Sequence, residues 1–214
     1  MRITVFGATG NVGRRVVAEA VSRGHEVTGV ARTAVRLIGL PGEGPGSLRV
    51  RAGDATDVDD VVASITGQDV VITATCPSPG DEAGLVAVAT TLLTASAKTG
   101  VRLLLVGGAG SLTVEDGGRL MDRPGYPPFL LPIASACVDQ LAACRAHPTA
   151  DWSYLSPPDL LVPGDRTGRY RVGADELLVD ADGESRISME DLAVALLDEA
   201  ERPRHHRTRF TVAY

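Results

Sequence analysis

The residues with the clearest capacity for chemistry lie in a glycine-rich turn close to the start of the chain. Gly7, Gly10 and Gly13 recur every third residue, after an apolar run typical of a strand and before a run with helical periodicity. Such a turn lets backbone N–H groups approach a phosphate, and the N-terminus of the helix adds partial positive charge. The spacing is weak evidence by itself, but a strand before it and a helix after it are the context that a dinucleotide site requires. We therefore expect the pyrophosphate of a nicotinamide dinucleotide to bind here, the alternative being glycines that only turn the chain; the expected contacts are Gly7, Thr9, Gly10, Asn11, Val12 and Gly13.

The end of the second predicted strand indicates which dinucleotide is bound. Proteins that prefer NAD usually place an acidic side chain there, where it binds the ribose 2′-hydroxyl. Residues 27–42 contain no acidic residue, whereas Arg32 stands at the strand end and Arg36 follows about one turn later. Because two guanidinium groups can bind a 2′-phosphate bidentately, we expect NADP(H) to be preferred, with NAD(H) also accepted. The alternative is that both arginines are solvated surface residues.

Two further strand ends are expected to border the same cofactor. Asp54 and Ala55 follow the third predicted strand, on the adenine side, although Asp54 could instead cap the next helix. Ala74, Thr75 and Cys76 end the fourth predicted strand, beside the ribose and the nicotinamide. Cys76 is either a redox thiol or a bystander, and a lowered thiol pKa would favour the first interpretation.

The elements that must position these residues alternate between short apolar strands and helical periods. Strands are predicted at 3–6, 27–31, 48–52, 70–73, 102–106, 152–155 and 209–213. Helices are predicted at 12–21, 58–65, 83–98, 134–146 and 189–200, the first closed by Gly24 and the second and fifth opened by capping boxes at Thr56 and Ser188. This alternation predicts an α/β protein, with a Rossmann-like doubly wound parallel sheet and a small C-terminal extension on the substrate side.

The length of the chain favours a single NAD(P)-binding Rossmann domain over residues 1–214. Its substrate side is expected to be built from residues 111–132 and 156–188. The first segment includes a loop-like stretch, 117–132, that could act as a lid, and the second is rich in proline and glycine as far as residue 173.

Composition argues against several classes of function. The chain has 214 residues, 22% of them charged, with a formal net charge of -6 and no basic block, so nucleic-acid binding is unsupported. We expect no membrane span, because no apolar run approaches the roughly 20 residues required, and no secretion signal. Three cysteines without a CxxC pair predict reduced thiols in the cytoplasm. We expect no metal site, since His147 and the pair His205 and His206 lack ligand neighbours, and the acidic residues within 180–184 are better explained by a turn.

Motifs along nearly the whole chain resemble those of one family. Besides the turn at 7–13 they are Val106-Gly107-Gly108-Ala109-Gly110-Ser111-Leu112, Leu155-Ser156-Pro157-Pro158-Asp159, residues 163–168, residues 185–188 and residues 209–213. In these motifs the chain resembles the atypical short-chain dehydrogenase/reductase superfamily, specifically its NAD(P)H-binding, NmrA-like branch related to NADH-flavin reductases and biliverdin-IXβ reductase. The resemblance implies that Ser111 faces nicotinamide and substrate, where its hydroxyl could bind a carbonyl or relay a proton, and that Pro157 and Pro158 line the pocket. The alternatives are a turn cap for Ser111 and loop stiffening for the prolines.

One motif of the superfamily is missing. Members that act on alcohols and carbonyls use a Tyr-x-x-x-Lys pair, in which the lysine lowers the tyrosine pKa so that the phenol exchanges a proton with substrate. Lys98 is the only lysine of this chain, and the residue four positions earlier is Thr94. The sequence therefore argues against ordinary dehydrogenase, epimerase or dehydratase chemistry.

Reduction of a flavin does not need that pair, because hydride passes to an electron-poor ring and the protein only stacks and orients the two rings. We therefore predict an NAD(P)H-dependent, flavin reductase-like oxidoreductase. Its small-molecule acceptor is expected to be FMN, FAD or another flat conjugated compound such as a quinone or linear tetrapyrrole, and the protein a monomer or homodimer. The alternatives are a non-catalytic NADP(H)-sensing regulator of NmrA-like type and a specialised isomerase or reductase of a biosynthetic pathway.

Overall fold

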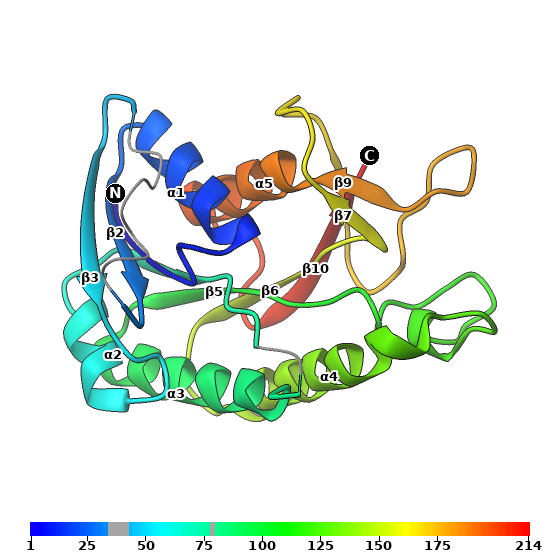
Figure 1. Ribbon diagram of the computed structural model, residues 1–214, viewed down its shortest axis with the longest axis horizontal. Helices are drawn as coiled ribbons and strands as arrows, with labels where there is room; N and C mark the ends of the chain where they lie inside the picture. The colour runs from blue at the N-terminus through cyan, green and yellow to red at the C-terminus, as the bar shows by residue number, and fades with distance from the viewer. Residues whose placement is uncertain (34–42, 78–79) are drawn as a thin grey trace.

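The computed structural model describes residues 1–33, 43–77 and 80–214 and shows a central sheet between two layers of helices (Figure 1). The eight strands of the sheet have the order β3-β2-β1-β4-β5-β6-β10-β8. All neighbouring strands are parallel except β10 and β8, which are antiparallel. The predicted α/β class and Rossmann-like parallel sheet are confirmed. The strands are β1 (Arg2–Phe6), β2 (Glu26–Ala31), β3 (Ser47–Ala52), β4 (Val70–Thr73), β5 (Arg102–Val106), β6 (Trp152–Ser156), β8 (Arg171–Gly173) and β10 (Thr208–Ala213).

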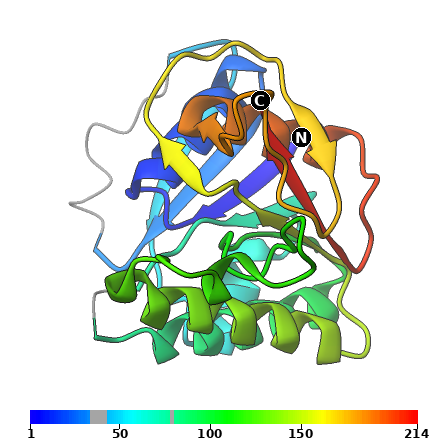
Figure 2. The same cartoon turned by 90° about the vertical axis from the view of Figure 1, so that its right-hand side faces the viewer.

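Helices cover both faces of this sheet, as the turned view shows (Figure 2). Helices α1 (Asn11–Ser22) and α5 (Met189–Glu201) pack together on one face. The other face carries α2 (Val58–Ile65), α3 (Ala83–Thr99) and α4 (Leu131–Ala146). Alternate strand residues enter the two cores: Leu104 packs on the α1 and α5 side, whereas Leu103 and Leu105 pack on the α3 and α4 side. Burial on both faces explains why the strands are continuous apolar runs.

The predicted boundaries of the helices and strands agree with the structure to within one residue, with one exception. Helix α4 begins at Leu131, three residues before the predicted start, and Pro132 lies in its first turn, where its missing N–H breaks no helical bond. Gly24 has a φ of +85° directly after α1 and ends that helix as predicted.

One of the two predicted capping boxes is wrong. Asp57, and not Thr56, is the N-cap of α2, because its carboxylate accepts bonds from the backbone N–H groups of Asp59 and Asp60. The prediction for α5 is confirmed, since the Ser188 hydroxyl accepts a bond from the backbone N–H of Asp191.

The C-terminal extension contains short strands that the sequence did not reveal. Strands β7 (Leu160–Val162) and β9 (Arg186–Ser188) form a separate parallel pair, and β8 adds an antiparallel edge to the main sheet. Each has three residues, too few for an alternating pattern to be recognised. The predicted lid stretch, 117–132, contains two 3-10 turns at Leu120–Asp122 and Pro128–Leu130.

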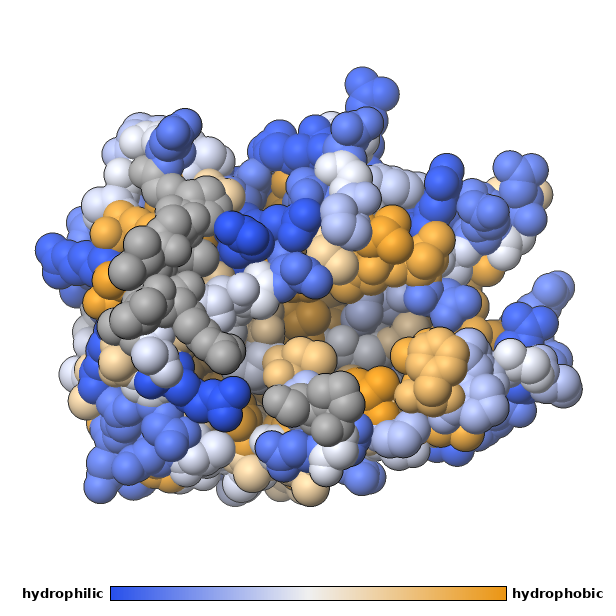
Figure 3. Space-filling view, in the orientation of Figure 1, coloured by the Kyte–Doolittle hydropathy of each residue, from blue (hydrophilic) through white to orange (hydrophobic). Residues whose placement is uncertain are grey.

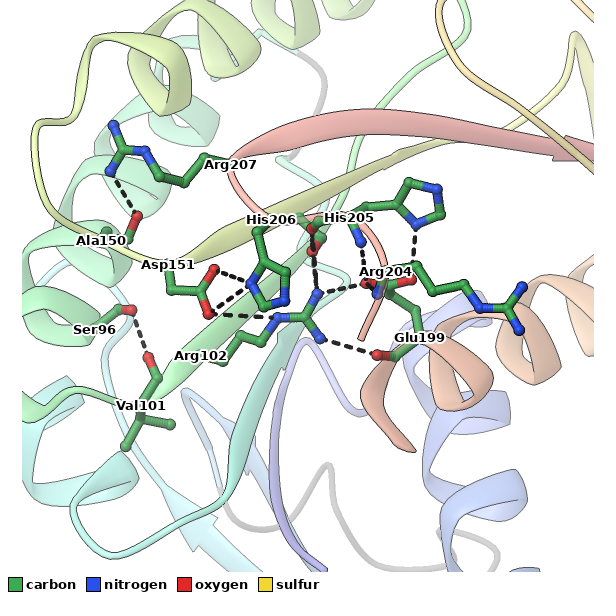
Figure 4. A network of polar contacts seen from close by, with 11 residues as sticks. Ser96, Val101, Arg102, Ala150, Asp151, Glu199, Arg204, His205, His206 and Arg207 are labelled. Atoms are coloured by element: carbon green, nitrogen blue, oxygen red, sulfur yellow. Dashed lines mark hydrogen bonds and ion pairs between the residues drawn. The ribbon is translucent and has the colours of Figure 1, made fainter. Parts of the chain in front are cut away.

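A polar network joins the amino ends of β5 and β6 to helix α5 (Figure 4). Arg102 donates to the Glu199 carboxylate at 2.5 Å, and the two side chains are only 10% and 3% exposed. Glu199 also accepts a bond from the His205 ring at 2.8 Å, and His206 bonds Asp151 at 2.9 Å. This network lies at the edge of the sheet opposite the glycine-rich turn, so it holds the scaffold together without entering the predicted site.

Candidate cofactor site

A cavity of about 840 Å³ opens at the carboxyl edge of the sheet, a size typical of cofactor sites. Its walls are formed by the segments that follow β1, β2, β3 and β4, together with the first turns of α3. The carboxyl edge is where parallel α/β sheets bind their ligands. The predicted residues that line the cavity are Gly7, Thr9, Gly10, Asn11, Val12, Arg32, Asp54, Ala55, Ala74, Thr75 and Cys76.

Two glycines of the turn are required by close backbone approach. Gly7 has a φ of +75°, and a Cβ there would lie 2.6 Å from the carbonyl oxygen of Ala74. A Cβ on Gly13 would lie 2.1 Å from the carbonyl oxygen of Gly7, so the first turn of α1 packs directly on the turn. Gly13 is buried and does not line the cavity. It supports the cofactor turn from behind.

The N-terminus of α1 is open to an anion. Gly10 is its N-cap and offers no side chain to the first N–H groups, and the first turn contains no acidic residue. Gly10, Asn11 and Val12 all line the cavity. The unpaired N–H groups and the positive end of the helix dipole therefore face the cavity, as the pyrophosphate of a nicotinamide dinucleotide requires.

The segments after β2 and β3 form another part of the cavity wall. Arg32 is exposed and lines it, whereas Arg36 lies outside the described residues. The Asp54 carboxylate accepts bonds from the hydroxyl of Thr56 at 2.7 Å and from its backbone N–H at 2.8 Å. These bonds, aided by the charge of Arg32, lower the pKa of Asp54. The alternative that Asp54 caps α2 is wrong, because Asp57 does so; Asp54 closes a local turn and stays ionised at the cavity wall.

The end of β4 forms the wall of the cavity next to the first turns of α3. Cys76 is exposed as a whole residue, but its thiol group is partly buried. This burial raises the pKa of the thiol. A raised pKa keeps the thiol protonated at neutral pH, which favours the bystander over the redox thiol.

Ser111 lies in the loop that follows β5, in a network that the sequence did not predict. Arg209 of β10 donates from one guanidinium nitrogen to the Ser111 hydroxyl oxygen at 2.8 Å and from its Nε to the Asp175 carboxylate at 2.7 Å. Ser111 is half-buried, Pro157 is buried, and neither is among the residues that line the cavity. The only signal for Arg209 was a charged residue in an otherwise largely apolar strand.

Neither the lysine nor the most buried tyrosine can replace the missing Tyr-x-x-x-Lys pair. Lys98 lies in the last turn of α3, about 20 Å along the helix from Leu85 of the cavity wall. Tyr154 is fully buried beneath Gly107, and its hydroxyl bonds the Gln140 side chain at 2.9 Å. Burial raises the pKa of Tyr154 well above its ordinary value.

Metal-binding and membrane-spanning features of the described part of the chain are as follows. Within residues 1–33, 43–77 and 80–214, no three His, Cys, Asp or Glu side chains are grouped so that they could hold a metal ion. The segment Pro128–Ala146 is long and apolar enough to cross a membrane by length and composition alone. It packs against α3 in the helical layer, and 28% of its apolar window is buried.

Several large apolar side chains are exposed at the start of α4 and on β7. Phe129 is 79% exposed and Leu131 38%, at the start of α4, while Leu160 and Val162 of β7 are 49% and 42% exposed. Figure 3 shows apolar surface over β7 and over the start of α4, with a hollow between them. These apolar rims would suit a flat organic molecule next to the cofactor.

Comparison with known proteins agrees with this geometry. The model of the NAD(P)H-binding family matches residues 7–203. The uncharacterized protein YwnB of Bacillus subtilis (strain 168) is 37% identical over 222 residues, which cover 99% of this chain and 98% of that protein.

Three solved structures are similar over the whole chain. A "putative epimerase" from Bacteroides thetaiotaomicron has a TM-score of 0.90 at 40% identity, covering 100% of this chain and 96% of that one. A "putative exported protein" from Burkholderia pseudomallei has a TM-score of 0.89 at 39% identity, covering 100% of both chains. A "putative NADH-flavin reductase" from Streptococcus pneumoniae has a TM-score of 0.87 at 31% identity, covering 100% of this chain and 99% of that one. With a glycine-rich turn under an open helix N-terminus and a family match over most of its length, this chain belongs to the NAD(P)H-binding family.

Proposed function

We propose that the protein is an NAD(P)H-dependent oxidoreductase that reduces a flat conjugated acceptor such as FMN, FAD, a quinone or a linear tetrapyrrole. The observation that carries the proposal is the cavity at the carboxyl edge, which presents an open helix N-terminus but no Tyr-x-x-x-Lys pair. Such a site can bind and orient a dinucleotide. Reduction of a flavin-type acceptor does not require a strong general acid from the protein. The name of the similar Streptococcus pneumoniae protein supports the same reaction class.

The chain's own residues would supply binding, orientation and exclusion of water. When bound, the nicotinamide supplies a hydride. The turn at 7–13 would hold the pyrophosphate, Arg32 would bind the 2′-phosphate of a preferred NADP(H), and Ala74, Thr75 and Cys76 would border the ribose and nicotinamide. We assign the acceptor side to residues 111–132 and 156–188, with Ser111 and Pro157 nearest the reacting rings, and the whole of 1–214 to one functional domain.

We also place the protein in the cytoplasm, as a monomer or homodimer. Its three cysteines are free, and two of them are buried, which is typical of proteins in a reducing compartment. Because one similar structure is named an exported protein, fractionation of cells expressing the tagged chain is the direct check.

The test of the proposed function is oxidation of NADPH, followed by its absorbance, after addition of FMN, FAD, riboflavin or simple quinones. We expect turnover with at least one of these acceptors and weaker activity with NADH. Binding of NADPH without turnover of any acceptor would contradict the proposal. If bound cofactor instead changed the oligomeric state, the NADP(H)-sensing alternative would be favoured.

A further inference from the structure

Arg209 is a buried arginine that joins the loop after β5, at Ser111, to the segment after β8, at Asp175. Its side chain is 5% exposed although it carries a full charge. The guanidinium donates to the hydroxyl and carbonyl oxygens of Ser111 at 2.8 and 3.2 Å, to the Asp175 carboxylate at 2.7 Å and to the Asp175 carbonyl at 3.3 Å. A buried charge is tolerated when it is paired and fully hydrogen-bonded in this way.

The loop that Arg209 holds follows the carboxyl end of β5, which pairs with β4, the strand whose end borders the cavity. Gly108 lies against Cys137 of α4, where an added Cβ would come within 2.9 Å of the sulfur, and Gly110 lies equally close to Ala134. The loop is thus clamped between α4 on one side and Arg209 on the other. Ser111 is half-buried in this loop.

The contact with Arg209 determines whether the Ser111 hydroxyl donates or accepts in that hydrogen bond. A guanidinium group has only donors, so the Ser111 oxygen must accept the bond, and the serine hydrogen must point elsewhere. Within the described ranges of the chain, no protein group accepts a bond from that hydrogen. A hydroxyl that accepts from a cation is also a stronger donor, because the charge draws electron density from its oxygen.

We propose that Arg209 is a positioning residue that makes Ser111 an obligatory hydrogen-bond donor to the acceptor, and so selects acceptors with a ring-conjugated carbonyl oxygen. This inference rests on the proposed function. The hydride and its electron pair pass from NADPH, which becomes NADP⁺, to a ring atom of the acceptor. The negative charge moves by conjugation to the carbonyl oxygen, where the Ser111 hydroxyl stabilises it, and a proton from water then neutralises it. Quinones and isoalloxazines both have such an oxygen.

The test compares four variants: Ser111→Ala, Arg209→Gln, the double variant, and Arg145→Gln. Arg145 is the matched control, because its guanidinium lies 3.5 Å from the same Asp175 carboxylate and makes no recorded bond to Ser111. We expect kcat to fall about 10²-fold in Ser111→Ala and about tenfold in Arg209→Gln, and to stay unchanged in Arg145→Gln. Since Arg209 acts through Ser111, the double variant should be no slower than Ser111→Ala alone.

A second readout does not depend on turnover. The dissociation constant for FMN, measured by flavin fluorescence without NADPH, should rise in Ser111→Ala and Arg209→Gln and stay unchanged in Arg145→Gln. If Arg209→Gln does not fold, Arg209→Lys replaces it, because one ammonium group cannot bond Ser111 and Asp175 as the guanidinium fork does.

Three results would overturn the inference. If wild-type protein reduces acceptors and Arg209→Gln keeps its kcat, only the positioning role is wrong. If the effects of Ser111→Ala and Arg209→Gln multiply in the double variant, Arg209 acts on stability and not through Ser111. If wild-type protein neither binds nor reduces any carbonyl acceptor, the proposed function fails, and this inference fails with it.

Discussion

At the scale of single residues, Arg32 is the described residue best placed to set cofactor preference, since it lines the cavity at the end of β2 and is exposed. We expect Arg32→Asp to raise the dissociation constant for NADPH about tenfold to a hundredfold, because it removes a charge-assisted bond and adds repulsion. The constant for NADH should change little. Titration of each cofactor, followed by its fluorescence, measures both. Arg49→Asp is the matched control, an exposed arginine of β3 away from the cavity wall; equal losses for both cofactors would contradict the role of Arg32.

The backbone around Gly13 leaves no room for a side chain. A methyl group there would lie 2.1 Å from the Gly7 carbonyl oxygen, and backbone atoms cannot move aside as a flexible side chain can. Gly13→Ala should therefore destabilise the fold by about 1–3 kcal/mol and weaken NADPH binding. Gly118→Ala is the control, because its nearest neighbour would be 3.5 Å away. Thermal unfolding with and without NADPH measures both effects, and an unchanged melting temperature for Gly13→Ala would refute the packing argument.

Between elements, helix α1 is tied to the segment after β7 by the Glu19 carboxylate and to α5 by Arg23. Glu19 is 6% exposed and accepts bonds from Arg23 at 2.7 Å and from Arg166 at 2.6 Å. Burial alone would raise the pKa of Glu19, but the bonds from Arg166 and Arg23 outweigh it and lower the pKa. The same Arg23 also bonds Asp198 of α5 at 2.7 Å, so Glu19 lies at the centre of a network that joins three segments.

The two ends of that network predict unequal costs. Glu19→Gln removes a buried counter-charge of Arg23, whose side chain is 17% exposed, and should lower the free energy of unfolding by about 1.5–3 kcal/mol. Arg166→Gln removes a partner that is 54% exposed, and its loss should cost under about 1 kcal/mol. Urea denaturation of both variants gives the comparison. Equal costs would mean that Glu19 is not the structural centre of the contact.

In the whole molecule, the two ends of the parallel strands differ in structure: one is open and the other is closed by polar contacts. The carboxyl edge carries the open cavity, while the amino edge is closed by the network around Arg102 and Glu199 (Figure 4). Burial acts to raise the pKa of Glu199, but bonds from the His205 backbone, Arg102 and the His205 ring outweigh it and lower the pKa. The same net direction holds for Asp198, where bonds from Tyr170 and Arg23 outweigh burial.

These lowered pKa values predict an acid-sensitive fold. Because the native pKa lies below that of the unfolded chain, the unfolded state binds more protons in acid, and stability is lost as the pH falls through the native pKa. We expect the urea midpoint to be steady between about pH 7 and pH 5 and to fall steeply below about pH 4. Glu199→Gln should be less stable at neutral pH but lose less on acidification. A midpoint that stays level down to about pH 3 would show that these carboxylates are not held ionised by their partners.

Local patterns were enough to predict the alternating strands and helices of this fold and to single out the glycine-rich turn. Apolar strands buried on both faces and helices with a buried side leave periodic patterns, so β4, β5 and α2 were predicted residue for residue. The glycines at 7, 10 and 13 were recognisable for the same reason, since their spacing and their position between strand and helix are local properties.

Contacts between distant segments support the proposed acceptor side, and no local pattern predicted them. The pairing of β7 with β9 and the bonds of Arg209 to Ser111 join residues far apart in sequence, and nothing local records such contacts. Likewise, the N-cap of α2 depended on backbone geometry that selected Asp57 over its neighbour Thr56. The binding turn could therefore be located from sequence, because it is built from consecutive residues. The contact of Arg209 with Ser111 could not, because packing between distant segments brings these two residues together.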